Sequence, residues 1–287
     1  MMLDVISWVK NGAWVLPRTL KRLERVLPSE CVHRKIMVDD DSSDETRNVG
    51  KDFNWEVYMN PHSGISSGAN FALSKVDCPY FMSFEQDLLL SDNWWNNISS
   101  KFSDSKVVVA SGVRFADAPQ HLRKLQEYPL LGYINKNSDH WCEANFRVGK
   151  TLDNTMYRTK VLLELGGFPS LRHNTGVDTV LSYIIFSKGL KWYVDFSVRS
   201  LHLRSGVKQE LNHQRWYGFG FNEINGKIKE ETGLQLPVNS VGLFARLFSS
   251  PIRGLQVALK MKDARITYLY PMMRFSCCQG FLNGRKY

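Results

Sequence analysis

Strand-like apolar runs alternate with helix-like segments along the first half of this 287-residue chain, and no other feature limits its fold as strongly. Each run is short and rich in branched or aromatic residues, which is typical of buried strands. The pattern predicts strands at 3–9, 34–38, 56–59, 80–84 and 106–111, with helices at 15–26 and 67–75. Strands that alternate with helices favour the α/β class, with a mostly parallel central sheet flanked by helices.

The second half of the chain is less regular. Residues 117–147 are rich in His, Trp and Asn, and we expect them to form a long loop region over a site. After them the pattern predicts helices at 159–165 and 178–188 and strands at 190–195 and 197–202. In an open parallel sheet, ligands bind beyond the carboxyl ends of the strands, so acidic residues just past those ends are the candidates to weigh.

The charge of the chain is concentrated at one end. Formal net charge is +9, and residues 237–287 hold eight Lys and Arg against Asp263 alone, which is 8 − 1 = +7. The first 236 residues therefore carry only 9 − 7 = +2. We expect a domain over 1–236 and a basic tail over 237–287, and a surplus confined to one end argues against a nucleic-acid partner.

The basic tail is also apolar, and many of its apolar residues recur at helical spacing. A helix with an apolar stripe and a cationic face can lie in the interface of a bilayer. The tail therefore predicts contact with an anionic membrane surface. The alternative is a helical lid packed on the main domain, with solvated basic residues.

Cysteine content and the ends of the chain bear on location. The five cysteines are an odd number without CxxC spacing, which disfavours a zinc framework and favours a reducing compartment. No apolar run approaches the roughly 18 residues of a spanning helix, and the N-terminus lacks the pattern of a signal peptide. We expect a cytoplasmic protein, peripheral on the cytosolic face of a membrane.

Two acidic clusters follow predicted strands. Residues 38–46 read VDDDSSDET, in which three adjacent carboxylates need a cation, hydrogen-bond donors or water to offset their repulsion. The alternative is a solvated turn in which Ser42, Ser43 or Asp44 caps a helix. Residues 84–87 read FEQD, and two carboxylates at one strand end can approach Mg²⁺ or Mn²⁺.

The two acidic clusters belong to a longer series of short motifs within residues 3–205. They are VKNG at 9–12, VDDDSSDET at 38–46, NPHSG at 60–64, GAN at 68–70, FEQD at 84–87, GGF at 166–168 and GVD at 176–178. In this order the chain resembles the family 2 glycosyltransferases, which use nucleotide sugars and have the Rossmann-like GT-A fold. The resemblance implies inverting transfer of a sugar from a UDP- or GDP-linked donor to a glycan or lipid-linked acceptor, with Mg²⁺ or Mn²⁺.

The resemblance also implies roles for individual residues. Asp178 matches the catalytic base, and Asp87 the direct metal ligand, with His202 as a candidate further ligand. The donor-binding positions are Lys10, Asn11, Gly12, Asp39, Asp41, Gly64, Gly68, Asn70, Glu85 and Gln86. The acceptor-side positions are Gly167, Phe168, Arg215 and Trp216.

Several positions depart from the family pattern or allow a simpler explanation. The DxD position reads Glu85-Gln86-Asp87, residues 68–70 lack the Arg of the usual ARN, and residues 212–216 resemble QxxRW with the Gln displaced. Asp178 also suits the first turn of a helix without catalysis, because a carboxylate is favoured there by the helix dipole. His202 is a candidate metal ligand or a contact for the diphosphate, and because a histidine at a strand end is often structural, that alternative stays open. The altered DxD leaves open a catalytically weak nucleotide-sugar-binding or scaffold protein.

Overall fold

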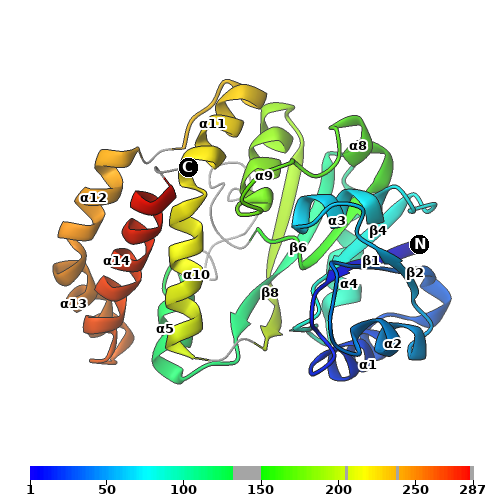
Figure 1. Cartoon of the computed structure of the whole chain (residues 1–287), viewed down its shortest axis with the longest axis horizontal. Coiled ribbons are helices and arrows are strands. Elements are labelled where there is room, and N and C mark those ends of the chain that lie inside the picture. The colour runs from blue at the N-terminus through cyan, green and yellow to red at the C-terminus, as the bar shows by residue number, and fades with distance from the viewer. Residues whose placement is uncertain (132–149, 204–205, 237–238, 285–287) are drawn as a thin grey trace. The chain divides into compact units, whose positions relative to one another are not determined.

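The chain divides into two units. The computed structural model describes residues 1–131, 150–203, 206–236 and 239–284 (Figure 1). Unit 1 comprises residues 1–114, 136–170 and 177–203, and unit 2 comprises residues 115–135, 171–176 and 204–287. The boundary at 236/237 that charge predicts remains a prediction, and the packing groups residues 204–236 with the tail.

Unit 1 is built around an eight-stranded sheet with the order β3-β2-β1-β4-β7-β6-β8-β5. The strands are β1 Leu3–Val9, β2 Val32–Asp39, β3 Glu56–Met59, β4 Tyr80–Phe84, β5 Leu88–Leu89, β6 Val107–Ala116, β7 Asn154–Arg158 and β8 Lys191–His202. β1 pairs in parallel with β2 and β4, and β2 with β3. β7 is antiparallel to β4 and β6, and β5 is antiparallel to β8. The predicted α/β class with a GT-A sheet is therefore confirmed.

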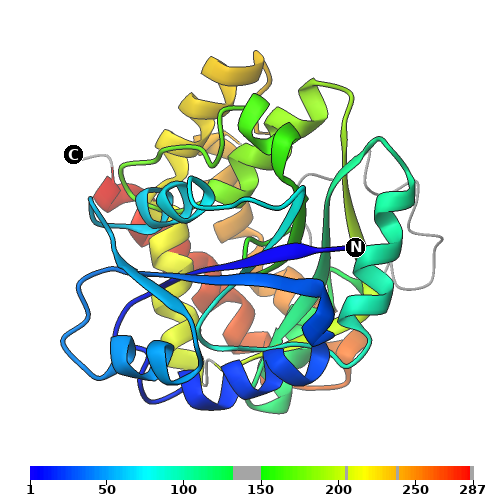
Figure 2. The ribbon, with the colours of Figure 1, turned by 90° about the vertical axis from the view of Figure 1, so that its right-hand side faces the viewer.

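Helices cover both faces of this sheet. They are α1 Leu16–Val26, α2 Thr46–Asp52, α3 Ile65–Leu73, α4 Trp94–Ser100, α8 Thr159–Glu164 and α9 Val177–Ser187, with short 3₁₀ turns at Ser29–Cys31 and Lys101–Ser103. Figure 2 shows α1 and α2 (blue) on one face and α3 (cyan) on the other. α1 begins with Pro17 in its first turn and buries Leu16, Leu20 and Leu23 at helical spacing.

Two expectations for the second half of the chain are wrong. The strands expected at 190–195 and 197–202 are one strand, β8. The Asp195 carboxylate accepts hydrogen bonds from the Ser197 backbone N–H (2.9 Å) and hydroxyl (2.6 Å), so these polar residues are satisfied without ending the strand. The loop expected at 117–147 contains helix α5 Gln120–Glu127, which buries Leu122 and Leu125. Residues 132–147 lie outside the described residues.

Unit 2 is helical in its described residues. Besides α5 it contains α10 Val207–Phe219, α11 Phe221–Thr232, α12 Ser240–Phe248, α13 Ser250–Met261 and α14 Ile266–Gly284. The predicted C-terminal helical tail is therefore present in residues 239–284. Among the helices of the described chain, none combines the length and hydrophobicity needed to span a bilayer.

Helices α10 and α14 approach each other backbone to backbone, because glycine lies at their contact. A Cβ atom on Gly218 would lie 1.9 Å from the Cys277 carbonyl oxygen, and one on Gly280 would lie 1.8 Å from the Arg215 carbonyl oxygen. Both distances are far below van der Waals contact, and the obstacle is backbone that cannot rotate away. A side chain at either position must push the helices apart.

Gly218→Ala is therefore expected to lower the free energy of unfolding of unit 2 by about 3 kcal/mol, the upper part of the usual range for overpacking. Thermal or urea unfolding measures the change. Gly226→Ala in α11 is the matched control. It has open space around its Cβ position and is expected to raise stability by about 1 kcal/mol. Equal effects of the two substitutions would contradict the close contact.

Candidate active site

Parallel pairing brings the loops after β1, β2 and β3 to one edge of the sheet. The Asp40 N–H donates to the Val9 carbonyl (2.8 Å), and the Asn60 N–H donates to the Asp39 carbonyl (2.8 Å). These two bonds continue the backbone hydrogen bonding of β1 with β2 and of β2 with β3 into the loops that follow. The predicted donor-binding positions of three separate motifs therefore lie next to one another.

The loop after β1 is held by side chains from two other loops. The Gln86 amide accepts from the Lys10 N–H (2.9 Å) and donates to the Lys10 carbonyl (3.0 Å). The Asn11 N–H donates to the Ser42 hydroxyl (2.8 Å), and Asn11 has a φ of 49°. A Cβ on Gly12 would lie 2.8 Å from Gln86 Oε1, so a larger residue there would displace the Gln86 side chain. The Gln86 amide thus holds the backbone of Lys10, and its contact with the donor remains a prediction.

The three adjacent aspartates after β2 have different surroundings. Asp39 is fully buried, and its Oδ2 accepts from the Ser42 N–H (3.0 Å), while no described group bonds its Oδ1. Asp40 accepts from the Gly64 N–H (3.0 Å) and lies 3.4 Å from the Lys10 Nζ. Asp41 is exposed. Local donors therefore offset the repulsion, and Asp39 retains an acceptor for a ligand.

Gly64 and α3 form the next segment. Gly64 has a φ of 102°, a conformation that favours glycine, and this directs its N–H to Asp40. Gly68 lies against Trp8, since a Cβ there would be 3.1 Å from the Trp8 Cβ. Both residues therefore hold the loop close to the edge of the sheet.

The Asn70 side chain ties α3 to the segment that contains Gly167 and Phe168. The Asn70 amide donates to the Phe168 carbonyl (2.8 Å) and accepts from the Phe168 N–H (2.8 Å). A Cβ on Gly167 would lie 2.6 Å from Asn70 Oδ1. The Phe168 ring is 2% exposed and packs edge-on against Trp8 and Tyr157. The predicted donor-side role of Asn70 and acceptor-side roles of Gly167 and Phe168 remain predictions.

Glu85, Asp87 and His202 come together at the β5–β8 pair. The His202 Nε2 lies 3.1 Å from Asp87 Oδ1 and 3.6 Å from Glu85 Oε2. One ligand atom from each residue falls within 4.8 Å of the others. The buried His202 Nε2 has no hydrogen-bond partner among the described residues, although it faces two carboxylates. A divalent cation between the three would satisfy this nitrogen, and a mixed N/O ligand set suits Mn²⁺ better than Mg²⁺.

Asp178 lies within electrostatic range of this cluster. It is in the first turn of α9, and desolvation raises the pKa of its carboxyl above the usual range. The Arg114 guanidinium opposes this shift of the Asp178 pKa, and the Glu85 carboxylate reinforces it. Arg114 Nη1 is itself 3.4 Å from Glu85 Oε2. A carboxyl with a raised pKa within electrostatic range of a candidate metal site is a candidate general base.

Sequence reasoning missed Arg114 and Asp153. Arg114 bridges Glu85 and the fully buried Asp153. Asp153 Oδ1 has no hydrogen-bond partner among the described residues. The available signal was Arg114 itself, since it interrupts the apolar run VVVASGVRFA of β6. A cation within a buried strand implies a buried carboxylate nearby.

Arg215 and Trp216 belong to α10 in unit 2. The Trp216 indole N–H donates to the His173 carbonyl (3.2 Å), and Trp216 stacks on His213. Arg215 is exposed and donates to Gln279 Oε1 (3.2 Å). Their acceptor-side role remains a prediction.

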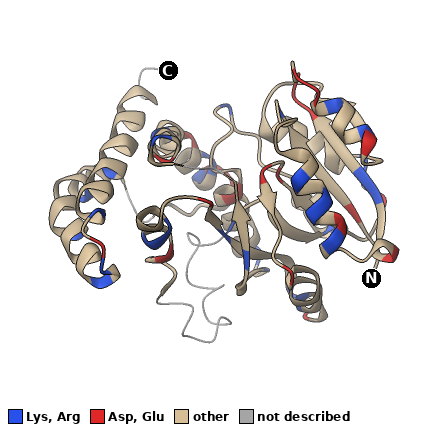
Figure 3. Cartoon of the chain, turned by 90° about the horizontal axis from the view of Figure 1, so that it is seen from below, with Lys and Arg blue, Asp and Glu red and all other residues tan. Residues whose placement is uncertain are grey.

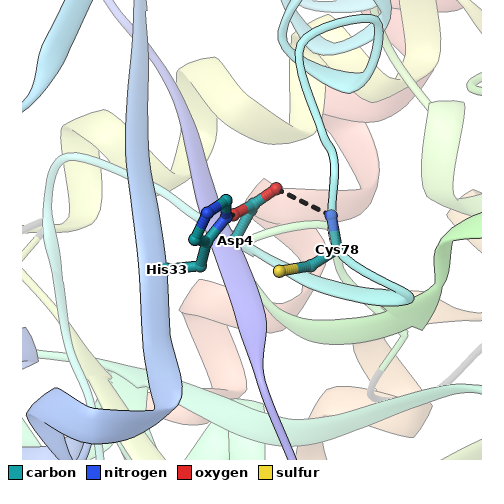
Figure 4. A group of neighbouring side chains, drawn as sticks. All are labelled: Asp4, His33 and Cys78. Atoms are coloured by element: carbon teal, nitrogen blue, oxygen red, sulfur yellow. Dashed lines mark hydrogen bonds and ion pairs between the residues drawn. The ribbon is translucent and has the colours of Figure 1, made fainter.

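A second group of possible metal ligands lies at the start of β1, away from the donor loop. Asp4, His33 and Cys78 form this group (Figure 4). Asp4 pairs with His33 Nδ1 (3.0 Å) and accepts from the backbone N–H groups of Asp77 (2.7 Å) and Cys78 (3.1 Å). Burial, reinforced by Asp4, raises the pKa of the Cys78 thiol to about 11, which opposes the thiolate that a metal requires. The Asp4 contacts explain this group as a structural link between β1, β2 and the turn before β4.

Comparisons with solved structures support the fold. The mannosyltransferase PcManGT from Pyrobaculum calidifontis, in complex with GDP-Man and Mn²⁺, is similar with a TM-score of 0.70 and 15% identity, covering 99% of this chain and 86% of that one. S. aureus TarS 1–349 is similar with a TM-score of 0.56 and 15% identity, covering 99% and 89%. The same TarS segment in complex with UDP gives 0.53 and 14%, covering 99% and 89%.

The sequence comparison identifies the family. No curated protein sequence matches the chain significantly. The model of glycosyl transferase family 2 matches residues 4–166, which is more than half of the chain and spans every strand of the sheet up to β7. The chain therefore belongs to glycosyl transferase family 2.

Proposed function

We propose that this glycosyltransferase carries out metal-dependent, inverting transfer of a hexose from a UDP- or GDP-sugar. The observation that carries the proposal is the cluster of Glu85, Asp87 and His202. In it a buried imidazole nitrogen, which no described group hydrogen-bonds, faces two carboxylates. Asp178 lies within electrostatic range of the same cluster. Unit 1 therefore contains a candidate cation site and a candidate general base that interact electrostatically.

The donor site is proposed at the edge where the loops after β1, β2 and β3 meet. Asp39 Oδ1 would accept a hydrogen bond from the nucleotide base, and it lacks a partner among the described residues. Lys10, Asn11 and Gly12 would contact the nucleotide, together with Asp41, Gly64 and the N-terminal part of α3. The GDP-Man and UDP complexes of proteins with the same fold support a nucleotide donor without choosing between the two bases.

Asp87 and His202 are proposed to hold the cation, with Glu85 beside them. When bound, Mg²⁺ or Mn²⁺ supplies positive charge that stabilises the diphosphate leaving group. Arg114 is 3.4 Å from Glu85 and offers a further fixed positive charge.

Asp178 is proposed as the base that takes the proton of the acceptor group. For inversion, the acceptor attacks the anomeric carbon on the face opposite the leaving diphosphate. A carboxylate with a raised pKa is better matched to a hydroxyl proton than an ordinary aspartate.

The acceptor is proposed to be a glycan or a lipid-linked group, reached at the cytosolic face of an anionic membrane through residues 237–287. Arg215 and Trp216 offer an exposed guanidinium and a half-buried indole, a combination that suits a glycan. The altered DxD favours a second candidate, a donor-binding protein with weak catalysis, because Gln86 is bonded to Lys10 and Glu85 is paired with Arg114.

A donor panel tests the proposal. UDP- and GDP-sugars are titrated with and without Mn²⁺ by calorimetry, and release of the nucleoside diphosphate is followed. We expect Mn²⁺-dependent binding of one base class, slow hydrolysis of that donor, and a product of inverted anomeric configuration once an acceptor is found. Binding without hydrolysis or transfer would favour the second candidate, and failure of both base classes to bind would contradict both candidates.

A further inference from the structure

The C-terminal helices carry apolar stripes on their solvent side. On α13, Ile252, Leu255 and Leu259 are at least half exposed and lie at helical spacing. On α14, exposed apolar residues recur in the same way at Tyr268, Met272, Phe275 and Leu282. On α12, Phe248 is 79% exposed. The opposite faces of these helices are packed, with Leu243, Val257 and Leu269 buried, so the exposed stripes are additional to the core of unit 2.

Three arginines gather beside these stripes. A cavity of about 500 Å³ within unit 2 is lined by Arg246, Arg253 and Arg274 together with Ile252, Gln256 and Tyr270. Arg253 donates to Gln256 Oε1 (3.1 Å), and Arg274 donates to the Tyr270 hydroxyl (3.3 Å). Both of these partners are neutral, so these two hydrogen bonds do not offset the charges of Arg253 and Arg274.

The acidic residue of the tail does not line this cavity. Asp263 is the one acidic residue of 237–287, and it pairs with Arg265 (2.8 Å) and Lys124 (3.6 Å). Its hydrogen bonds with Arg265 hold the pKa of the Asp263 carboxyl far below the usual range, so it stays ionised in that pair. No carboxylate is among the residues that line the cavity. Figure 3 shows the same imbalance, with Lys and Arg outnumbering Asp and Glu on these helices.

We propose that α12, α13 and α14 form a docking surface for an anionic phospholipid bilayer, with Arg246, Arg253 and Arg274 holding a headgroup phosphate. Guanidinium groups bind phosphate through paired N–H donors, and apolar stripes beside them enter the boundary between headgroups and acyl chains. A nucleic acid would use the charges but leave the aliphatic stripes in water. The inference deepens the proposed membrane-side acceptor, yet it concerns unit 2 alone and does not require donor chemistry.

Vesicle flotation tests the surface with the full chain. We expect retention on vesicles of phosphatidylcholine with phosphatidylglycerol, and weak retention on phosphatidylcholine alone. The triple variant Arg246→Gln, Arg253→Gln, Arg274→Gln is expected to bind anionic vesicles roughly 100-fold more weakly, since each basic residue near the surface contributes about 1 kcal/mol. Leu255→Ser with Leu259→Ser is expected to weaken binding while leaving the dependence on phosphatidylglycerol unchanged.

A matched charge control separates this surface from general basicity. Arg18→Gln, Lys21→Gln, Arg25→Gln removes three exposed positive charges from α1 in unit 1, and we expect vesicle binding close to wild type. Equal losses from the two triple variants, or full retention of the Arg246, Arg253, Arg274 variant, would overturn the proposal. So would self-association in ultracentrifugation without vesicle binding, since a second copy would then cover the stripes. Donor binding measured on the same variants keeps this outcome separate from failure of the proposed function.

Discussion

Asp178→Asn is expected to reduce sugar transfer by about 1,000-fold while nucleotide-sugar affinity stays within a few-fold of wild type. The substitution keeps the size of the side chain and removes its negative charge and its capacity to take a proton. Transfer under saturating donor and calorimetric donor binding measure the two quantities. Glu164→Gln on α8 is the matched control, because it removes one carboxylate from an exposed position of unit 1 and should leave both values unchanged.

The raised pKa of Asp178 adds a pH signature. A base must be deprotonated, so the acid limb of the pH profile of transfer is expected at higher pH than for an ordinary aspartate, whose pKa is near 4. When a carboxyl has a higher pKa in the folded than in the unfolded state, its ionisation lowers the free energy of unfolding of the protein. This loss develops as the pH rises from the unfolded pKa through the folded pKa. Asp178→Asn should therefore stabilise the metal-free protein at neutral pH, and this gain should vanish below pH 4. Normal turnover, or an unchanged melting temperature at both pH values, would contradict the assignment.

Substitution of the proposed cation ligands is expected to reduce sugar transfer as strongly as Asp178→Asn. Asp87→Ala and His202→Ala should each lower Mn²⁺-dependent transfer by about 1,000-fold, because charge neutralisation on a leaving diphosphate is worth several kcal/mol. Glu85→Gln should have a smaller effect, since Glu85 lies farther from His202 and shares its charge with Arg114. Calorimetric titration of Mn²⁺ in the presence of nucleoside diphosphate, with transfer rates, measures these effects.

Chelation gives an independent test of the same site. EDTA should abolish transfer by the wild type, and added Mn²⁺ should restore it. The His33→Ala variant is the matched control, because it removes a histidine from the group at the other end of β1 and should keep the Mn²⁺ requirement intact. Full activity after chelation would contradict a metal-dependent mechanism.

The parallel half of the sheet was predictable because its strands contain short apolar runs, most completely in β1. β1 has every residue buried, and such strands appear in the sequence as continuous apolar runs. Asp39 and Asp87 could be placed beside a site because Asp39 ends β2 and Asp87 comes shortly after the end of β4. The antiparallel half was less visible, since β7 contains polar residues, and β5 has only two residues, Leu88 and Leu89.

The side-chain partners in the site could not be predicted from the sequence. Pairing of Leu88 with His202 brings together residues that are 114 positions apart, and no local pattern encodes that register. Arg114 and Asp153 lie much closer in the chain, but they too meet only through the pairing of β6 with β7. Gln86 matches a family position by sequence, but only coordinates reveal that its amide is bonded to Lys10.

The glycine contact between α10 and α14 has a consequence at a lipid surface. Helices whose backbones touch are held by dispersion forces between closely spaced atoms, and this attraction does not depend on surrounding water. Helix pairs held by apolar side chains lose their driving force in hydrocarbon, because acyl chains solvate those side chains equally well. With Gly218 and Gly280 at the contact, α14 would keep its packing against α10 if its outer stripe entered acyl chains at the proposed bilayer surface.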